Sequence, residues 1–206
     1  MRVSPILLLL LAISWATLTD CRGVDGSPKG ASDNDYVEVP RRHAYPRIAL
    51  PDSTYSFTSA GKSHLVIAVN DAATSTLRSS DDGNSCFVDV AYPKLQSTIF
   101  YTITPVDRAT LSDVIANRMQ RIELNMGASD AELLEFDTPA GFECKVFVTR
   151  GDISTPVQFL STDGTNLVVS GAAFVREASP ATADSIAPIV DVISRDVVHT
   201  LKTMHL

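Results

Sequence analysis

The sequence has few of the residues, and none of the short motifs, on which most enzyme classes depend. It contains 3 cysteines and 4 histidines in 206 residues, and none of them forms a C-x-x-C or H-E-x-x-H metal motif. A G-x-S-x-G nucleophile elbow, a P-loop and a G-x-G-x-x-G dinucleotide motif are also missing. The sequence offers no catalytic, metal-binding or cofactor-binding residues, so we expect a non-enzymatic protein without a cofactor.

A basic surface and a long apolar run are missing too. The net charge is −7, and removing residues 1–20 leaves it unchanged because Arg2 and Asp20 are lost together. Nucleic acids and anionic lipids bind concentrated positive charge, so neither is an expected partner. Beyond residue 20, no apolar run approaches the roughly 20 residues that span a bilayer. The 45% hydrophobic and 20% charged residues are typical of a packed globular domain.

Residues 1–20 have the layout of a secretory signal peptide. Arg2 supplies the positive start, and Ile6 to Ile13 form an apolar segment too short to span a membrane stably. Cleavage after Ser14-Trp15-Ala16 would release a soluble protein. Leu18-Thr19-Asp20-Cys21 instead resembles a bacterial lipobox, although Asp20 stands where a small residue is usual. We favour the lipobox, with acylation of Cys21.

The rest of the chain divides into a tether and one domain. Residues 21–40 are small, polar and interrupted by glycine and proline, which predicts a flexible tether behind the lipidated cysteine. Residues 41–206 are long enough for a single globular domain. The basic cluster at residues 41–47 could bind an anion, but such runs are more often solvated surface, and we favour that interpretation.

The most informative stretch of the domain is Ser154 to Val175, which predicts a β-hairpin. Asp163-Gly164 suits a two-residue type I′ turn, and pairing outward from it sets Phe159 opposite Val168. The apolar run Leu167-Val168-Val169 lacks polar alternation, which is typical of a strand covered on both faces. We therefore expect this strand to be central.

Other segments complete an α+β fold. Residues 64–69 predict a strand, residues 70–85 a polar loop, and residues 86–103 and 131–149 one hairpin each. Apolar residues at helical spacing predict amphipathic helices from Thr110, with a capping box to Asp113, and from Ser185 to Met204. Consecutive hairpins favour a mainly antiparallel sheet of about six to seven strands, packed with two helices.

Two pairs of residues invite a site hypothesis. Asp196 and His199 stand three apart on the last helix, where they could orient a general base, but a surface ion pair is the interpretation we favour. Cys86 and Cys144 fall on the core faces of their strands. An oxidising compartment would allow a disulfide if those strands are neighbours, and two buried free thiols are the favoured alternative.

Five segments of the chain, in order, resemble the GldD family of gliding-motility lipoproteins over roughly residues 36–206. They are Pro40 to Pro51, Cys86-Phe87-Val88-Asp89 with Tyr92-Pro93, Ser154-Thr155-Pro156-Val157-Gln158-Phe159 through Thr162-Asp163, Gly171-Ala172-Ala173-Phe174, and Asp184-Ser185-Ile186-Ala187-Pro188 running into Arg195-Asp196-Val197-Val198-His199. Residues 56–80 depart from the family's pattern. The order of elements also resembles the PsbP-like α+β fold, an analogy that says nothing of function.

The resemblance implies a periplasm-facing envelope lipoprotein, with the outer membrane as its expected location, needed for gliding or for Type IX secretion. Its partners would be other envelope proteins of that machinery, and the membrane itself through the lipid anchor. The family carries no established catalytic residues, so none are transferred. The alternative is a periplasmic binder of small molecules or carbohydrates, which would need a large apolar pocket with a few convergent polar groups. A hydrolase ranks third, because it needs a nucleophile beside a perturbed acid or base.

The lipid anchor can be tested directly. We expect Cys21 to be acylated, because it is the cysteine that lies between the apolar segment and the tether. Radiolabelled fatty acid should enter the wild-type protein and should not enter the Cys21→Ala variant. Equal labelling of both proteins would contradict the prediction, and a mature N-terminus at Thr17 would support the soluble alternative.

Overall fold

The computed structural model describes residues 48–81 and 83–206, all of which belong to one compact unit, Tyr45–Leu206. The predicted signal peptide, the acylated Cys21, the tether and the basic cluster at residues 41–47 lie outside the described residues. The strands are β1 (Tyr55–Ser59), β2 (Val66–Asn70), β3 (Thr74–Ser79), β4 (Cys86–Tyr92), β5 (Ser97–Pro105), β6 (Ala131–Asp137), β7 (Glu143–Thr149), β8 (Val157–Thr162) and β9 (Leu167–Val175). The helices are α2 (Leu111–Met126) and α3 (Ala183–Thr203), with short 3₁₀ turns η1 (Gly61–Ser63) and η2 (Pro93–Leu95).

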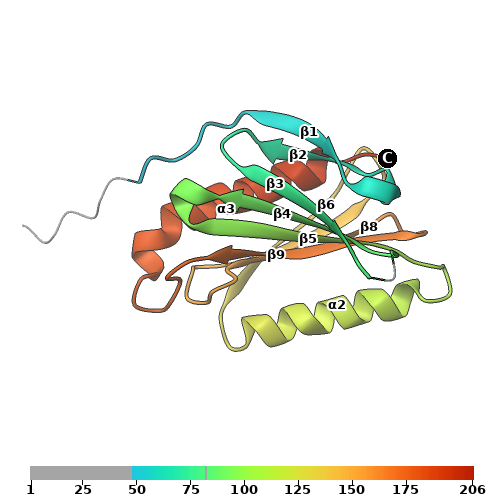
Figure 1. The fold of residues 1–206 in the computed structure, drawn as a ribbon. Helices are drawn as coiled ribbons and strands as arrows, with labels where there is room; N and C mark the ends of the chain where they lie inside the picture. Colours follow the sequence, from blue (N-terminus) through green and yellow to red (C-terminus); the bar gives the residue numbers. More distant parts are fainter. Residues whose placement is uncertain (1–47, 82) are drawn as a thin grey trace, which may run out of the picture. The chain divides into compact units, whose positions relative to one another are not determined.

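The predicted α+β class is confirmed. Seven strands form an antiparallel sheet in the order β3-β4-β5-β9-β8-β7-β6, and β1 pairs with β2 in a second, two-stranded sheet (Figure 1). The strand β9 lies fourth of seven, as its unbroken apolar run predicts. Helix α3 lies on one side of the large sheet and α2 on the other. Neither described helix is long and apolar enough to cross a membrane.

The structure adds two strands that the sequence did not predict. β3 lies within the segment predicted as a loop, and all six of its residues are exposed. Such a strand has no buried face, so no apolar alternation marks it, and backbone pairing with β4 holds it at the sheet edge. β1 is likewise rich in serine and threonine, and among the described strands it pairs only with β2.

The helices begin differently from the prediction. Thr110 precedes α2, but its hydroxyl donates to the carbonyl of Asp107 and makes no capping bond, so the predicted capping box with Asp113 is wrong. Helix α3 starts two residues before Ser185, after Thr182. Pro188 therefore lies in the second turn of α3, where one helical hydrogen bond is lost because proline has no N–H.

The loop between β8 and β9 is longer than predicted. The strands β8 and β9 pair outward from Thr162 and Val168, and residues 163–166 connect them in place of a two-residue turn. The Asp163 carboxylate closes this loop: its Oδ1 accepts backbone N–H bonds from residues 165, 166 and 167 at 2.9, 3.0 and 3.0 Å. The Asp163 side chain thus shapes the loop. The dipeptide Asp163-Gly164, which predicts a two-residue turn, gives no sign of this role.

The new register corrects the predicted partner of Phe159. Phe159 lies opposite Gly171, and Val168 lies opposite Thr162. Because the register differs by three residues, an odd number, Phe159 and Val168 face opposite sides of the sheet. Both side chains are nevertheless 0% exposed, since helices cover both faces of this hairpin.

Position 171 requires glycine because neighbouring atoms leave no space for a Cβ, and not because of its backbone angles. A Cβ at this position would lie 2.1 Å from the carbonyl oxygen of Phe100 and 2.3 Å from Cζ of Phe159. The ring of Phe159 therefore occupies the space that any other residue would fill, and it also packs on Tyr101 with 5.0 Å between ring centroids. This close approach fixes which residues of β5, β8 and β9 face each other.

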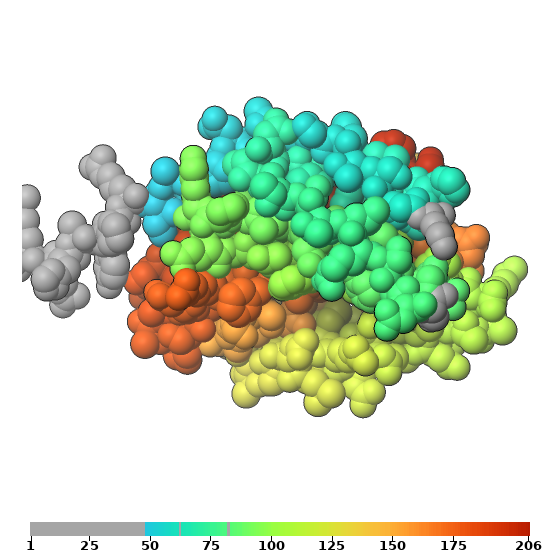
Figure 2. Space-filling view, in the orientation of Figure 1, coloured from blue at the N-terminus to red at the C-terminus, as the bar shows by residue number. Residues whose placement is uncertain are grey.

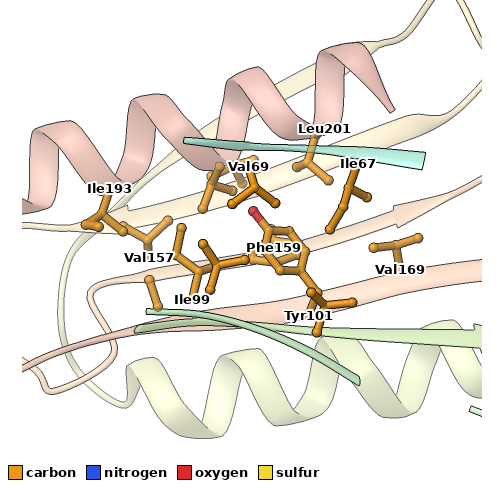
Figure 3. Packing of buried hydrophobic residues seen from close by; sticks show 14 of the residues in the cluster. Ile67, Val69, Ile99, Tyr101, Val157, Phe159, Val169, Ile193 and Leu201 are labelled. Atoms are coloured by element: carbon orange, nitrogen blue, oxygen red, sulfur yellow. The ribbon is translucent and has the colours of Figure 1, made fainter. Parts of the chain in front are cut away.

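The two faces of the sheet carry separate apolar layers. Between the sheet and α3 lies the larger layer, to which β2 also contributes, and Figure 3 shows its side chains meeting there. The predicted stripe of α3 belongs to it: Ile186, Ile189, Val190, Ile193, Val197 and Leu201. The smaller layer lies under α2 and contains that helix's predicted stripe: Leu111, Val114, Ile115, Met119 and Ile122. Both predicted amphipathic faces are confirmed.

The contribution of the central hairpin to stability can be measured by truncating one of its buried side chains. Phe159→Ala should lower the free energy of unfolding by about 3–5 kcal/mol, because it opens a cavity beside Gly171 and Tyr101. Phe174→Ala is the matched control on the same hairpin. Its side chain is 40% exposed, so the loss should stay below about 1 kcal/mol. Chemical denaturation of both variants measures this difference, and equal losses would contradict the assignment of Phe159 to the core.

Candidate functional site

The most polar cluster in the core surrounds Asp196, which is only 2% exposed. Its Oδ1 accepts a hydrogen bond from the Tyr55 hydroxyl at 2.6 Å. Its Oδ2 accepts one from the Tyr92 hydroxyl at 2.8 Å and one from Asn70 Nδ2 at 3.2 Å. A buried carboxylate is tolerated when its oxygens are hydrogen-bonded in this way. The predicted surface ion pair at Asp196 is therefore wrong.

Each member of the Asp196 cluster comes from a different element. Asp196 lies on the side of α3 that meets β2, Tyr55 begins β1, Asn70 ends β2 and Tyr92 ends β4. Tyr55 and Asn70 are also paired residues of the small sheet. The carboxylate thus connects the helix with both sheets. The same helix makes a further buried contact nearby, where the Thr200 hydroxyl donates to the carbonyl of Ala68 at 2.7 Å.

His199 contributes to this region through its ring rather than through an acid–base pair. It stacks on Tyr55 with 3.8 Å between ring centroids and 21° between ring planes. No hydrogen bond or ion pair joins His199 to Asp196 in the part of the chain that the structure describes. The arrangement lacks the bond by which a carboxylate orients a histidine base.

The electrostatics of the cluster keep its tyrosines neutral. Burial, followed by the hydrogen bond to Asp196, raises the pKa of Tyr55 to about 12. Burial and the charge of Asp196 also raise the pKa of Tyr92 above its usual range. Neutral hydroxyls that donate to a carboxylate hold it in place, and burial separates this carboxylate from solvent. We conclude that the Asp196 cluster docks α3, and that it is a structural feature of the domain.

The two cysteines of the domain are free and buried. Cys86 lies on β4 and Cys144 on β7, with β5, β9 and β8 between them in the sheet. Strands are about 4.8 Å apart, so four spacings far exceed the roughly 7 Å that a disulfide can span between Cα atoms. The disulfide considered from the sequence is not formed. Cys144 instead contacts the hydroxyl of Ser161, with 3.0 Å between Sγ and Oγ.

Two hollows elsewhere on the surface do not suit a ligand of defined chemistry. One of about 750 Å³ near the loop between β3 and β4 has a lining that mixes Ser79, Asn84 and Asp107 with apolar residues. It is not the mainly apolar pocket that the small-molecule alternative requires. The other, of about 480 Å³, lies beside the start of α3 and gathers Asp184 and Asp191. Within residues 48–81 and 83–206, no cluster of three His, Cys, Asp or Glu could hold a metal ion.

A row of aromatic side chains crosses the sheet on the α2 side, where Figure 2 shows the yellow helix along the lower edge of the domain and green strands above it. We call Phe87, Phe100 and Phe174 the aromatic row. By the strand register they share one face of β4, β5 and β9 and stand at diagonal positions. Phe100 is 41% exposed and Phe174 is 40% exposed, so α2 leaves this part of the face uncovered.

Sequence reasoning missed the aromatic row, although a signal for it exists. In β5 the buried residues alternate with an outward series of threonines at 98, 102 and 104. Phe100 interrupts that polar series with a large apolar side chain. An aromatic residue at an outward position of an otherwise alternating strand is a sign of a contact surface.

Comparison with known proteins identifies one family. The family model described as gliding motility lipoprotein GldD matches residues 34–206, which include all the described residues. No curated protein and no solved structure gives a match.

The structural role of Asp196 predicts a specific stability effect. Asp196→Asn replaces one acceptor oxygen by an NH₂ group, so at least one of the donors Tyr55, Tyr92 and Asn70 loses its partner. We expect the free energy of unfolding to fall by about 1–3 kcal/mol. Asp191→Asn, on the exposed side of the same helix, should change it by less than about 0.5 kcal/mol. Denaturant titration of the two variants measures the difference, and equal stability would show that the cluster does not hold α3.

Proposed function

The chain belongs to the GldD family of gliding motility lipoproteins, and we propose that it is a non-enzymatic accessory protein of the gliding and Type IX secretion machinery. The family implies a role in gliding motility and a location in the cell envelope. In our proposal the protein acts by binding other envelope proteins. The observation that carries the proposal is the family match, which spans most of the sequence and is not restricted to one motif.

The proposal includes a lipid anchor on Cys21 and a position on the periplasmic side of the outer membrane. The lipobox-like Leu18-Thr19-Asp20-Cys21 supports the anchor, and the polar residues 22–40 would let the domain reach away from the lipid surface. Fully extended, a chain of this length spans up to about 60 Å. A domain held in this way meets partners at high effective concentration.

The aromatic row is the surface that we propose for protein contacts. Aromatic side chains and arginine are enriched in the centres of protein interfaces, where burial of their area stabilises the complex. Arg78 lies over the ring of Phe87, 5.8 Å from its centroid, and forms an ion pair with Asp89 at 2.7 Å. The row therefore has an apolar centre with a charged rim. We assign no chemistry to Asp196 or His199.

Deletion and complementation test this function in a gliding host. Loss of the gene should abolish colony spreading, or impair export of Type IX cargo in a species that does not glide. The wild-type gene should restore the phenotype, whereas a Phe100→Ser and Phe174→Ser double variant should fail, because it removes the apolar contact surface. Leu124→Ser is the matched control, since Leu124 is 73% exposed on α2, away from the row, and it should restore spreading.

Two further variants separate this proposal from an enzyme. His199→Ala and Asp196→Asn, tested singly at matched abundance, should restore spreading nearly as well as wild type. Failure of both with unchanged folding would overturn the proposal and would direct attention to a site on α3. Full spreading by the Phe100→Ser and Phe174→Ser variant would overturn the contact surface while leaving the family role intact.

A further inference from the structure

A small hollow with several polar side chains in its lining adjoins the aromatic row. It measures about 180 Å³ and lies between α2 and the strands β5, β8 and β9. We call it the arginine pocket and define it by Arg118, Arg121 and Asn125 of α2, together with Gln158 of β8. Phe100 lines the pocket as well as belonging to the row. A partner on the aromatic row would therefore reach the pocket without any rearrangement.

Gln158 presents a buried donor that has no acceptor. Its side chain is 2% exposed, and its Oε1 accepts a hydrogen bond from Asn125 Nδ2 at 3.2 Å. The Nε2 atom of the same amide is buried without a hydrogen-bond partner. Most buried polar groups in folded proteins are paired, and an unpaired one lowers stability. An amide N–H₂ in this position is suited to a ligand oxygen.

The two arginines add positive charge that the domain does not neutralise. Arg118 and Arg121 are three residues apart, so they project from the same face of α2. Neither forms an ion pair with a carboxylate among the residues that the structure describes. Burial, followed by the charge of Arg121, lowers the pKa of Arg118. A bound anion would offset this positive charge.

We propose that the arginine pocket binds a carboxylate of a partner protein, from an aspartate, a glutamate or a chain terminus. Guanidinium groups pair with a planar carboxylate through two parallel hydrogen bonds, and the Gln158 amide supplies a further donor. The partner segment carries an apolar residue beside the acid, which packs on Phe100 and Phe174. This inference rests on the proposed function, because it names the chemistry by which the contact surface recognises its partner.

Charge and size favour a protein carboxylate over a lipid headgroup. Attachment to anionic lipid relies on clusters of about 4–8 basic residues, whereas the pocket has two. The net charge of −7 also repels an anionic membrane surface. A hollow of about 180 Å³ admits the end of one acidic side chain but not an extended headgroup with its chains.

The test captures the carboxylate at the pocket in intact cells. An Arg118→Lys variant keeps the positive charge and adds a primary amine, to which a carbodiimide couples an adjacent carboxylate. Mass spectrometry then identifies the coupled residue. We expect coupling to an aspartate, a glutamate or a C-terminus of one envelope protein, several-fold above that of Gln120→Lys, the matched control on the exposed side of α2. Coupling no greater than in the control would overturn the proposal.

Competitors identify the chemical group. N-acetylglutamate, added during coupling, should reduce capture by Arg118→Lys more than the background coupling of Gln120→Lys, which corrects for the carbodiimide that free carboxylates consume. Inorganic phosphate at the same concentration should have a smaller effect on this ratio. A peptide that spans the captured residue should block capture, and the same peptide with an amide in place of the carboxylate should not. Stronger competition by phosphate, or blocking by both peptides, would overturn the carboxylate assignment.

Replacing Gln158 separates a role in partner binding from a purely structural role, because the two roles predict different effects on carbodiimide capture. Gln158→Met removes the unpaired amide, so the temperature at which the chain becomes protease-sensitive should rise by roughly 2–4 °C. Capture by the Arg118→Lys variant should fall several-fold in the same background, and unchanged capture would overturn the role of Gln158. A photo-crosslinking residue in place of Phe174 separates the two proposals. Partner capture there without carbodiimide coupling at the pocket would leave the proposed function standing and overturn only this inference.

Discussion

The contact of Phe159 with Gly171 is the constraint on which the arrangement of the domain depends. Because Gly171 has no Cβ, the ring of Phe159 can approach the backbone of β9 closely, and the carbonyl of Phe100 can do the same from β5. Three central strands are thereby fixed in one register. Alternation along those strands then decides which residues meet α3 and which meet α2. A shift of one residue would exchange the two faces and place polar residues in the core.

The helix α3 needs more than an apolar stripe, because it contacts both sheets. Its predicted stripe packs on the large sheet, but Val192, Asp196 and Thr200 form a second buried row at intervals of four residues. That row includes two polar side chains, and both have partners: Asp196 accepts from two tyrosines and an asparagine, and Thr200 donates to a carbonyl of β2. Directional hydrogen bonds therefore set the position of the small sheet on the helix.

The sequence predicts most of the elements, because their apolar residues follow helical or alternating spacing. It fails where burial does not decide the structure. β3 is fully exposed and is held by backbone pairing, so no pattern of side chains marks it. The loop at Asp163 depends on one carboxylate that accepts three backbone N–H groups. The single apolar stripe of α3 predicts one buried face and places Asp196 on the surface, whereas the small sheet covers a second face of the helix.

The Asp196 cluster and the arginine pocket differ in how completely their polar groups are paired. Toward α3 the buried carboxylate of Asp196 has a donor on each oxygen, as a structural core requires. Toward α2 the buried amide of Gln158 lacks an acceptor and two phenylalanines remain exposed. Arg118 and Arg121 form no ion pair within residues 48–81 and 83–206. Stability alone would favour replacement of each of these groups. The proposed partner would supply the missing acceptor and cover the apolar surface.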